Sequence, residues 1–330
     1  MNSLRFAICE FNHLQSIKTI KPKLLLLAMV PAFSLQPLAL RAQGALTPPG
    51  APAPTMLTLS QIEPRTPISF SPSQIVINQP GSYYLTTNLT VIGGNAIVIA
   101  ANNVTLDLNG FTIFSTSATP SGMAIQLGSG GGITNVTILN GHITSGITNS
   151  AGGVYGGGGF YYGIQYFSPS YNILVKDVSV IGCYYNGINL FVGNCTAVES
   201  CSVMIAGEAG IVASRVSRST AYQCGGVGIN ADIASDCRGD VIGAGYGIVA
   251  TTANNCYGYC TGSGYGLYAI GSANDCYGYC SGSGYGLYVA GSAIGCLGQS
   301  TAGVGIYAHI ANSCTVGGGT ANITYKYNMP

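Results

Sequence analysis

The chain has 330 residues, of which 47% are apolar and only 6% are charged, with 49 glycines and no tryptophan. This apolar fraction is sufficient for a folded core, which excludes a disordered chain. Five of the eleven basic residues lie in the first 44 positions, so the remainder carries six basic and nine acidic residues, a net charge of about −3. Without a basic face, nucleic acids and anionic membranes are not expected partners.

An export signal is predicted for residues 1–44. Lysines precede an apolar stretch at residues 24–40, and the small-x-small sequence Ala42-Gln43-Gly44 suits cleavage before Ala45. The alternative is an uncleaved anchor helix, which the prolines of the stretch disfavour. Residues 45–66 are rich in Pro and Ala and are predicted to form a linker. No later apolar run has membrane-spanning length, so we expect a mature chain without a transmembrane segment that is secreted, periplasmic or held at the cell surface.

A glycine followed by isoleucine or leucine recurs through the rest of the chain. These marker glycines, spaced by 18 to 24 residues, are Gly163, Gly187, Gly210, Gly228, Gly247, Gly266, Gly286 and Gly305. A period near twenty predicts a stacked solenoid. Short alternating runs separated by Gly, Ser and Asn predict strands and tight turns, and no helical period is present. Ala96-Ile97 and Ala124-Ile125 are interpreted as earlier versions of the same mark.

The fold class predicted from this repeat is all-β, a parallel β-helix over residues 67–320 with a tail at 321–330. Leucine-rich and calcium-binding nonapeptide repeats are excluded, because the required leucines and aspartates are absent. Ten marks predict about ten coils, stacked about 4.8 Å apart into a rod of about 50 Å. The aliphatic residue after each marker glycine is predicted to point inward, and the glycine to allow a sharp bend or a positive φ.

Eleven cysteines follow the expected signal, all between residues 183 and 314. Two sets recur every 20 residues, namely Cys256, Cys276 and Cys296, and Cys260 and Cys280. Neighbouring coils would bring such residues within disulfide range, which export permits. The alternative is a column of buried free thiols that act as small apolar side chains. Because C-x3-C without a nearby histidine is poor zinc geometry, we expect no metal and no cofactor.

Tyrosines are the candidate substrate-binding residues. If Cys256 and Cys260 face inward, alternation places Tyr257 and Tyr259 on the outside. The complete candidate set is Tyr257, Tyr259, Tyr268, Tyr277, Tyr279, Tyr288 and Tyr307. Aromatic columns suit stacking against sugar rings, with a polysaccharide or cell-envelope glycan as partner. The alternative is that the tyrosines only stabilise the sheet by stacking on one another.

A polar column is predicted eleven residues before the marker glycines. It contains Lys176, Glu199, Ser217, Asp236, Asn255 and Asp275. The charged members, Lys176, Glu199, Asp236 and Asp275, are weak catalytic candidates, because acid and base groups would converge there. The alternative is a solvated turn column whose ion pairs contribute little. The alignment depends on the strand register upstream of Cys237, because a shift of one residue there would take the later members out of the column.

The segment Gln61–Ile113, the Gly-Ile coils and the closing YKYNMP resemble bacterial exported right-handed parallel β-helix proteins of the pectate-lyase-like superfamily. The resemblance implies a right-handed, single-stranded β-helix, with PGSYYLTTNLTV as its opening coil. It does not imply an activity, because that superfamily includes lyases, hydrolases, epimerases, adhesins and inert rods. The enzyme motifs are missing: the chain has no adjacent Asp pair, no Gly-His-Gly, no Arg-x-Lys and no Asp-Pro-His-Asp. Asp236 and Asp275, two coils or about 10 Å apart, are too distant to share a calcium ion.

The sequence therefore predicts a non-catalytic exported protein of the cell envelope or extracellular space, with a tyrosine-lined surface for polysaccharide. Two alternatives remain: a polysaccharide lyase or glycoside hydrolase that acts through the polar column, and a purely structural surface rod.

Overall fold

The computed structural model describes residues 63–69, 71, 74–150, 152–166, 169–193 and 195–329. The expected signal peptide at 1–44 and the expected linker up to residue 62 lie outside these residues. Within the described part, no helix is long and apolar enough to cross a membrane.

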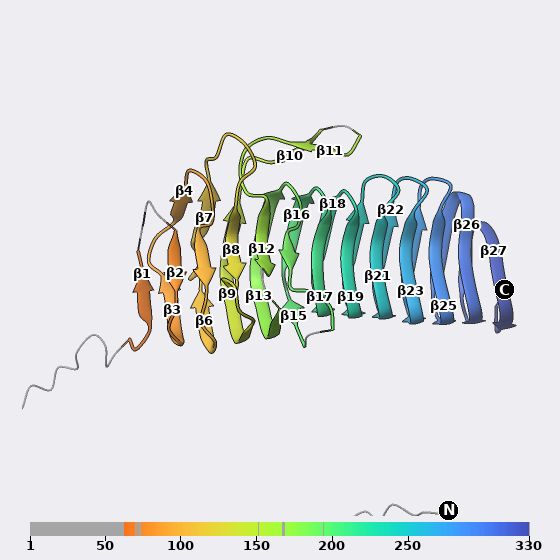
Figure 1. Ribbon diagram of the computed structural model, residues 1–330. Helices are drawn as coiled ribbons and strands as arrows, with labels where there is room; N and C mark the ends of the chain where they lie inside the picture. The colour runs from red at the N-terminus through yellow and green to blue at the C-terminus, as the bar shows by residue number, and fades with distance from the viewer. Residues whose placement is uncertain are drawn as a thin grey trace, which may run out of the picture. The chain divides into compact units, whose positions relative to one another are not determined.

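The described chain is an all-β parallel solenoid, as predicted (Figure 1). Twenty-five of its strands form one sheet, and strands in equivalent positions of successive turns pair in parallel. The strands are β1 (Thr66–Ile68), β2 (Ile75–Ile77), β3 (Gly81–Leu85), β4 (Leu89–Val91), β5 (Ile97–Ile99), β6 (Val104–Asp107), β7 (Thr112–Ser115), β8 (Met123–Leu127), β9 (Ile133–Thr144), β10 (Thr148–Ser150), β11 (Val154–Gly156), β12 (Tyr162–Tyr166), β13 (Ser170–Cys183), β14 (Ile188–Asn189), β15 (Ala197–Glu199), β16 (Ser202–Ala206), β17 (Ala209–Ser217), β18 (Thr220–Cys224), β19 (Val227–Ser235), β20 (Arg238–Val241), β21 (Tyr246–Asn254), β22 (Tyr257–Cys260), β23 (Tyr265–Asn274), β24 (Tyr277–Cys280), β25 (Tyr285–Ile294), β26 (Leu297–Asn312) and β27 (Thr315–Tyr327).

The aliphatic column after the marker glycines sets the number of turns. Its members from Ile97 to Ile306 are fully buried, as predicted. The pairing register continues this column to Ile75 on one side and Ala321 on the other, which gives twelve turns rather than ten. The two additional turns lack the Gly-Ile or Ala-Ile mark, so counting marks missed them. Strand β27 also runs to Tyr327, past residue 320, where a tail was expected to begin.

The predicted role of the marker glycines is wrong. Seven of the eight lie within strands, and none has a positive φ. A Cβ added at Gly266 would instead collide with the backbone nitrogen of Tyr279 on the opposite wall, and the same holds for Gly247 and Tyr259. The marker glycine therefore permits two walls of the solenoid to approach until their backbones touch. Because the inside has no room there, the bulky tyrosines of these turns lie outside.

A second column contains the residues that do have a left-handed backbone. Its members, with φ between 48° and 63°, are Asn140, Asp177, Ser200, Arg218, Asp236, Asn255, Asp275, Gly295, Ser313 and Asn328. Asn, Asp and Gly tolerate this conformation best, which explains most of the column. We call it the left-handed turn column.

A buried cysteine follows the left-handed residue in most of the later turns. Each such thiol donates to the backbone carbonyl two residues earlier, as Cys256 does to Asn254 at 3.1 Å. The same bond is made by Cys201, Cys237, Cys276, Cys296 and Cys314, with distances between 3.1 and 3.4 Å. Ser219 occupies the equivalent place and donates through its hydroxyl at 2.7 Å. All described cysteines are free, so of the two interpretations the structure has the thiol column.

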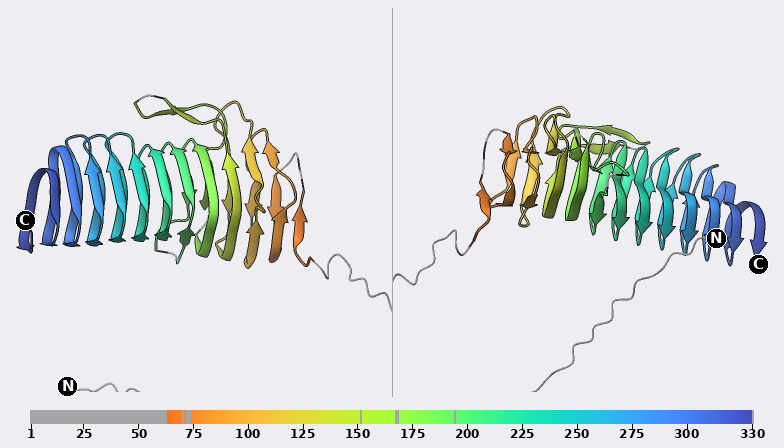
Figure 2. Two further views of the ribbon diagram at one scale, coloured as in Figure 1. Left: turned by 180° about the vertical axis from the view of Figure 1, so that it is seen from behind. Right: turned by 60° about the horizontal axis from the view of Figure 1, so that its bottom comes forward.

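A short antiparallel hairpin, β10 and β11, leaves the solenoid and runs along its side (Figures 1 and 2). Its Tyr155 hydroxyl donates to the carbonyl of Gln223 at 2.8 Å, which ties the hairpin to a later turn. Burial raises the pKa of Tyr155 well above its ordinary value, so this donor keeps its proton.

Candidate functional site

The structure places the seven candidate tyrosines in three columns on the outside of the later turns. Tyr257 lies beside Tyr277, and Tyr259 beside Tyr279, on paired strands β22 and β24. Tyr268, Tyr288 and Tyr307 form the third column on β23, β25 and β26. All seven side chains are half-buried, because each is partly covered by its neighbours.

A fourth column was missed by the sequence analysis. Tyr246, Tyr265 and Tyr285 stack with centroids 5.0 Å apart and ring planes within 8° of parallel. These rings pack edge-on against Tyr268 and Tyr288, at angles above 80°. The signal was present in the sequence, because each of these tyrosines directly precedes a marker glycine.

Ring orientation separates the columns that can meet a ligand from those that pack. Tyr288 lies parallel to Tyr307, at 3° and 4.3 Å, and within 13° of Tyr268. Parallel rings at this distance cover each other's faces, which leaves mainly edges for solvent. Tyr257 and Tyr277 are instead inclined to each other by 56° at 5.1 Å. Arg238 lies over one face of Tyr257, and Tyr277 lies within 19° of Tyr279 at the longer distance of 6.3 Å.

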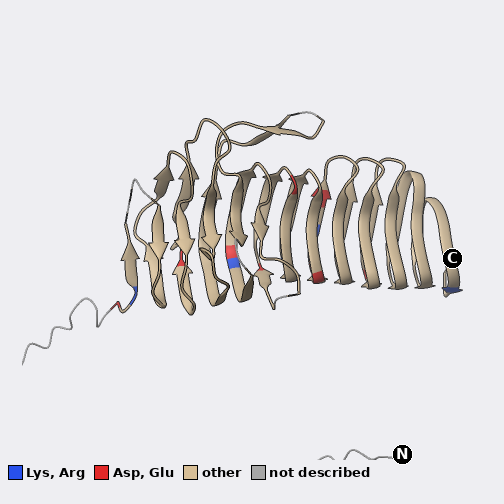
Figure 3. Cartoon of the chain, in the orientation of Figure 1, with Lys and Arg blue, Asp and Glu red and all other residues tan. Residues whose placement is uncertain are grey.

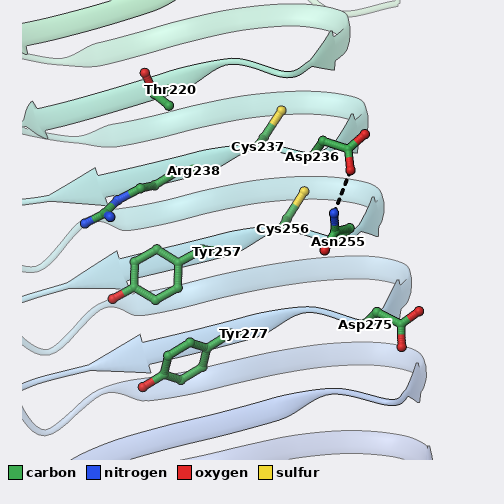
Figure 4. A pocket seen from close by; sticks show the side chains of 9 residues that line it. All are labelled: Thr220, Asp236, Cys237, Arg238, Asn255, Cys256, Tyr257, Asp275 and Tyr277. Atoms are coloured by element: carbon green, nitrogen blue, oxygen red, sulfur yellow. Dashed lines mark hydrogen bonds between the residues drawn. The ribbon is translucent and has the colours of Figure 1, made fainter.

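Tyr257 and Tyr277 line an open groove of about 390 Å³ (Figure 4). The complete lining is Thr220, Asp236, Cys237, Arg238, Asn255, Cys256, Tyr257, Asp275 and Tyr277. Three lining residues belong to the left-handed turn column, four come from strands β18, β20, β22 and β24, and the two cysteines lie between the turns and the strands. We call this the 236–277 groove.

Two rows of side chains run along the groove, one residue of each per turn. Asp236, Asn255 and Asp275 form a polar row, and Asn255 Nδ2 donates to Asp236 Oδ1 at 2.7 Å. Two residues further along each strand, Arg238 and the two tyrosines form the second row. The thiols between the rows are nearly inaccessible, since Cys237 is 4% exposed.

Arg238 is held within the groove wall. Its guanidinium lies 2.7 Å from the buried carboxylate of Asp240 and 4.9 Å from the centre of the Tyr257 ring. The hydrogen bonds that Arg238 donates to the carboxylate of Asp240 raise the pKa of Arg238 further. The positive charge of Arg238 is therefore paired with a buried carboxylate, while the Arg238 side chain itself is 53% exposed.

The predicted polar column is wrong beyond Ser217. Ser217 pairs with Ser235 and not with Asp236, because one more residue lies between Ser235 and Gly247 than between Ser217 and Gly228. Asp236, Asn255 and Asp275 consequently belong to the left-handed turn column. Lys176 and Glu199 lie beside each other in the neighbouring column on β13 and β15.

The weak catalytic candidates are therefore divided between two places. Glu199 pairs with Arg218 at 3.4 Å, and both side chains are well exposed. Asp236 and Asp275 lie two turns apart, or about 10 Å by the spacing of strands. Among the described residues, no group of three or more His, Cys, Asp and Glu side chains is placed to hold a metal ion.

Comparison with known proteins identifies no relative of this chain. No protein-family model, no curated protein and no solved structure matches the chain. The parallel β-solenoid is thus the level of classification that the fold itself supports.

Proposed function

We propose that this chain is a non-catalytic exported protein of the cell envelope or extracellular space that binds polysaccharide along the 236–277 groove. The observation that carries the proposal is the groove itself, where an aromatic row runs beside a row of amide and carboxylate groups. Aromatic rings accept the apolar face of a sugar, and the adjacent oxygens accept hydrogen bonds from its hydroxyl groups. We further propose a distant kinship with the pectate-lyase-like superfamily, based on the segments quoted above.

The repeat of the groove suits a repetitive ligand. Each turn adds one ring or one polar group after about 4.8 Å along the axis. A glycan chain aligned with this axis would meet Tyr257 and Tyr277 on successive turns, and Leu297 follows them in the next turn, so affinity should rise with its length over the turns of the groove. A small, isolated ligand gains nothing from such a repeat.

Binding without catalysis is favoured by the separation of the charged candidates. A glycosidase requires an acid and a base on either side of one bond, usually with one carboxyl group held protonated by burial. Asp236 and Asp275 are both exposed turn residues, and Lys176 and Glu199 lie in another column.

Migration in native gels that contain neutral, acidic and basic polysaccharides tests the proposal. We expect retardation by at least one glycan. The affinity for that glycan should fall about fivefold or more in the double variant Tyr257→Ala, Tyr277→Ala, since each aromatic contact contributes roughly 0.5–1.5 kcal/mol. Tyr171→Ala is the matched control, because Tyr171 is 48% exposed and lines a separate hollow with Tyr166, Pro169 and Phe191.

Three results would contradict the proposal. Shortened polymer in the retarded lane would establish the lyase or hydrolase alternative. Weaker glycan binding in Tyr171→Ala, with unchanged binding in the double variant, would place the site in the hollow that Tyr171 lines. Unchanged migration with every glycan would leave the purely structural rod.

A further inference from the structure

The later turns of the solenoid carry very few charges (Figure 3). After Asp240, the sequence contains only two charged residues, Asp275 and Lys326. Lys326 lies on β27, three turns beyond Asp275 and about 14 Å away along the axis. That separation exceeds the screening length of about 8 Å at physiological salt, so Lys326 does not neutralise Asp275.

The 236–277 groove therefore has an acidic field. Its lining includes the carboxylates of Asp236 and Asp275, and its one lining cation, Arg238, is paired with Asp240. One turn before Asp236, the guanidinium of Arg218 is directed to Glu199 and Ser200. In the described part of the chain, neither Asp236 nor Asp275 forms a salt bridge.

The backbone does not require aspartate at these two positions. Asn255, Gly295, Ser313 and Asn328 occupy the same left-handed turn column with φ between 49° and 63°. Asparagine would also keep the bond that Asp236 accepts from Asn255, through its amide oxygen. The conformation thus explains a short polar residue, but it does not explain two negative charges beside two tyrosines.

We infer that the 236–277 groove selects polysaccharides that carry positive charge, which among glycans are polymers of non-acetylated amino sugars, and disfavours uronic acid polymers. This inference rests on the proposed function and specifies the class of glycan. The ammonium groups of such a chain would approach Asp236 and Asp275 while its rings lie against Tyr257 and Tyr277. An ammonium group that follows the aromatic row would also gain a cation–π contact.

The test compares three oligosaccharides of equal length by calorimetry: a glucosamine oligomer, its fully N-acetylated counterpart and an oligogalacturonate. At low salt we expect the glucosamine oligomer to bind about 25-fold more tightly than the acetylated one, since each of the two carboxylates contributes about fivefold at close range in water. The oligogalacturonate should bind most weakly. The preference should shrink as salt is raised, because these carboxylates are exposed.

The double variant Asp236→Asn, Asp275→Asn removes the charge and keeps the turn conformation. It should bind the glucosamine and acetylated oligomers with affinities within about twofold of each other, because the Coulomb contribution is gone. Asp232→Asn is the control, since that carboxylate lies outside the groove and accepts a bond from the Gly193 amide that asparagine can also accept. It should leave the preference unchanged.

The outcomes separate the inference from the proposed function. Equal binding of all three oligomers, stronger binding of the oligogalacturonate, or a preference that survives in the double variant would overturn the inference alone. Absence of binding by every oligomer, together with unchanged migration in the polysaccharide gels, would overturn both.

Discussion

At the residue scale, the buried cysteines act as hydrogen-bond donors that close the left-handed turns. We predict that Cys256→Ala lowers the free energy of unfolding by about 0.5–1.5 kcal/mol, because the carbonyl of Asn254 loses the thiol as its second donor and keeps only the Asp236 amide at 3.0 Å. Cys256→Ser should cost less, since Ser219 makes the same bond in an earlier turn. Urea unfolding of both variants measures the difference. A serine variant less stable than the alanine variant would show that the thiol is needed only as apolar volume.

The same burial controls thiol chemistry. Desolvation raises the pKa of Cys183, Cys201 and Cys224 to about 12, so almost none of these thiols is ionised near neutral pH. Cys195 is the one described cysteine that is exposed. We expect an aromatic disulfide reagent to modify Cys195 rapidly in native protein that begins at Ala45 and so lacks Cys9, and the buried thiols only on unfolding. Cys195→Ser should abolish the rapid phase, and a rapid phase that persists would contradict the packing.

At the scale of the element, opposite walls of the solenoid depend on glycine. Gly266→Ala should destabilise the protein by about 1–3 kcal/mol, the usual cost of overpacking, because its Cβ would meet the backbone of β24. Gly131→Ala is the matched control, since a Cβ there meets no atom within 4 Å and the residue has no left-handed φ. The two variants are compared by urea unfolding. Equal free energies of unfolding for the two variants would mean that the walls can separate without loss of stability.

The elements also show which features the sequence could reveal. The period of the marker glycines predicted the solenoid, because stacking repeats one environment in every turn. The same period predicted a bend or a positive φ at the marker glycine, which is wrong, because a local sequence does not indicate which backbone lies on the opposite wall of the core. It also placed Asp236 in line with Ser217, because one residue added to a turn shifts every later position in a column. The groove combines two rows that were predicted separately, and they lie side by side because their members are two residues apart in each turn.

At the scale of the whole molecule, each turn of a solenoid contacts only the turns before and after it, so stability is close to a sum of nearest-neighbour terms. The strand pairings follow this rule: β23, which carries Gly266, pairs with β21 and β25. A perturbation at Gly266 should therefore weaken nearby turns and fade along the axis.

Hydrogen exchange followed by mass spectrometry tests this locality. We expect Gly266→Ala to accelerate exchange in peptides from β21, β23 and β25. Peptides from β5, β6 and β9 should keep the protection of the unmodified protein, because about six turns separate them from the substitution. Gly131→Ala should leave both regions unchanged. A uniform loss of protection along the chain would instead mean that all turns unfold as one cooperative unit. The groove at Tyr257 and Tyr277 would then depend on every turn of the solenoid and not only on its neighbours.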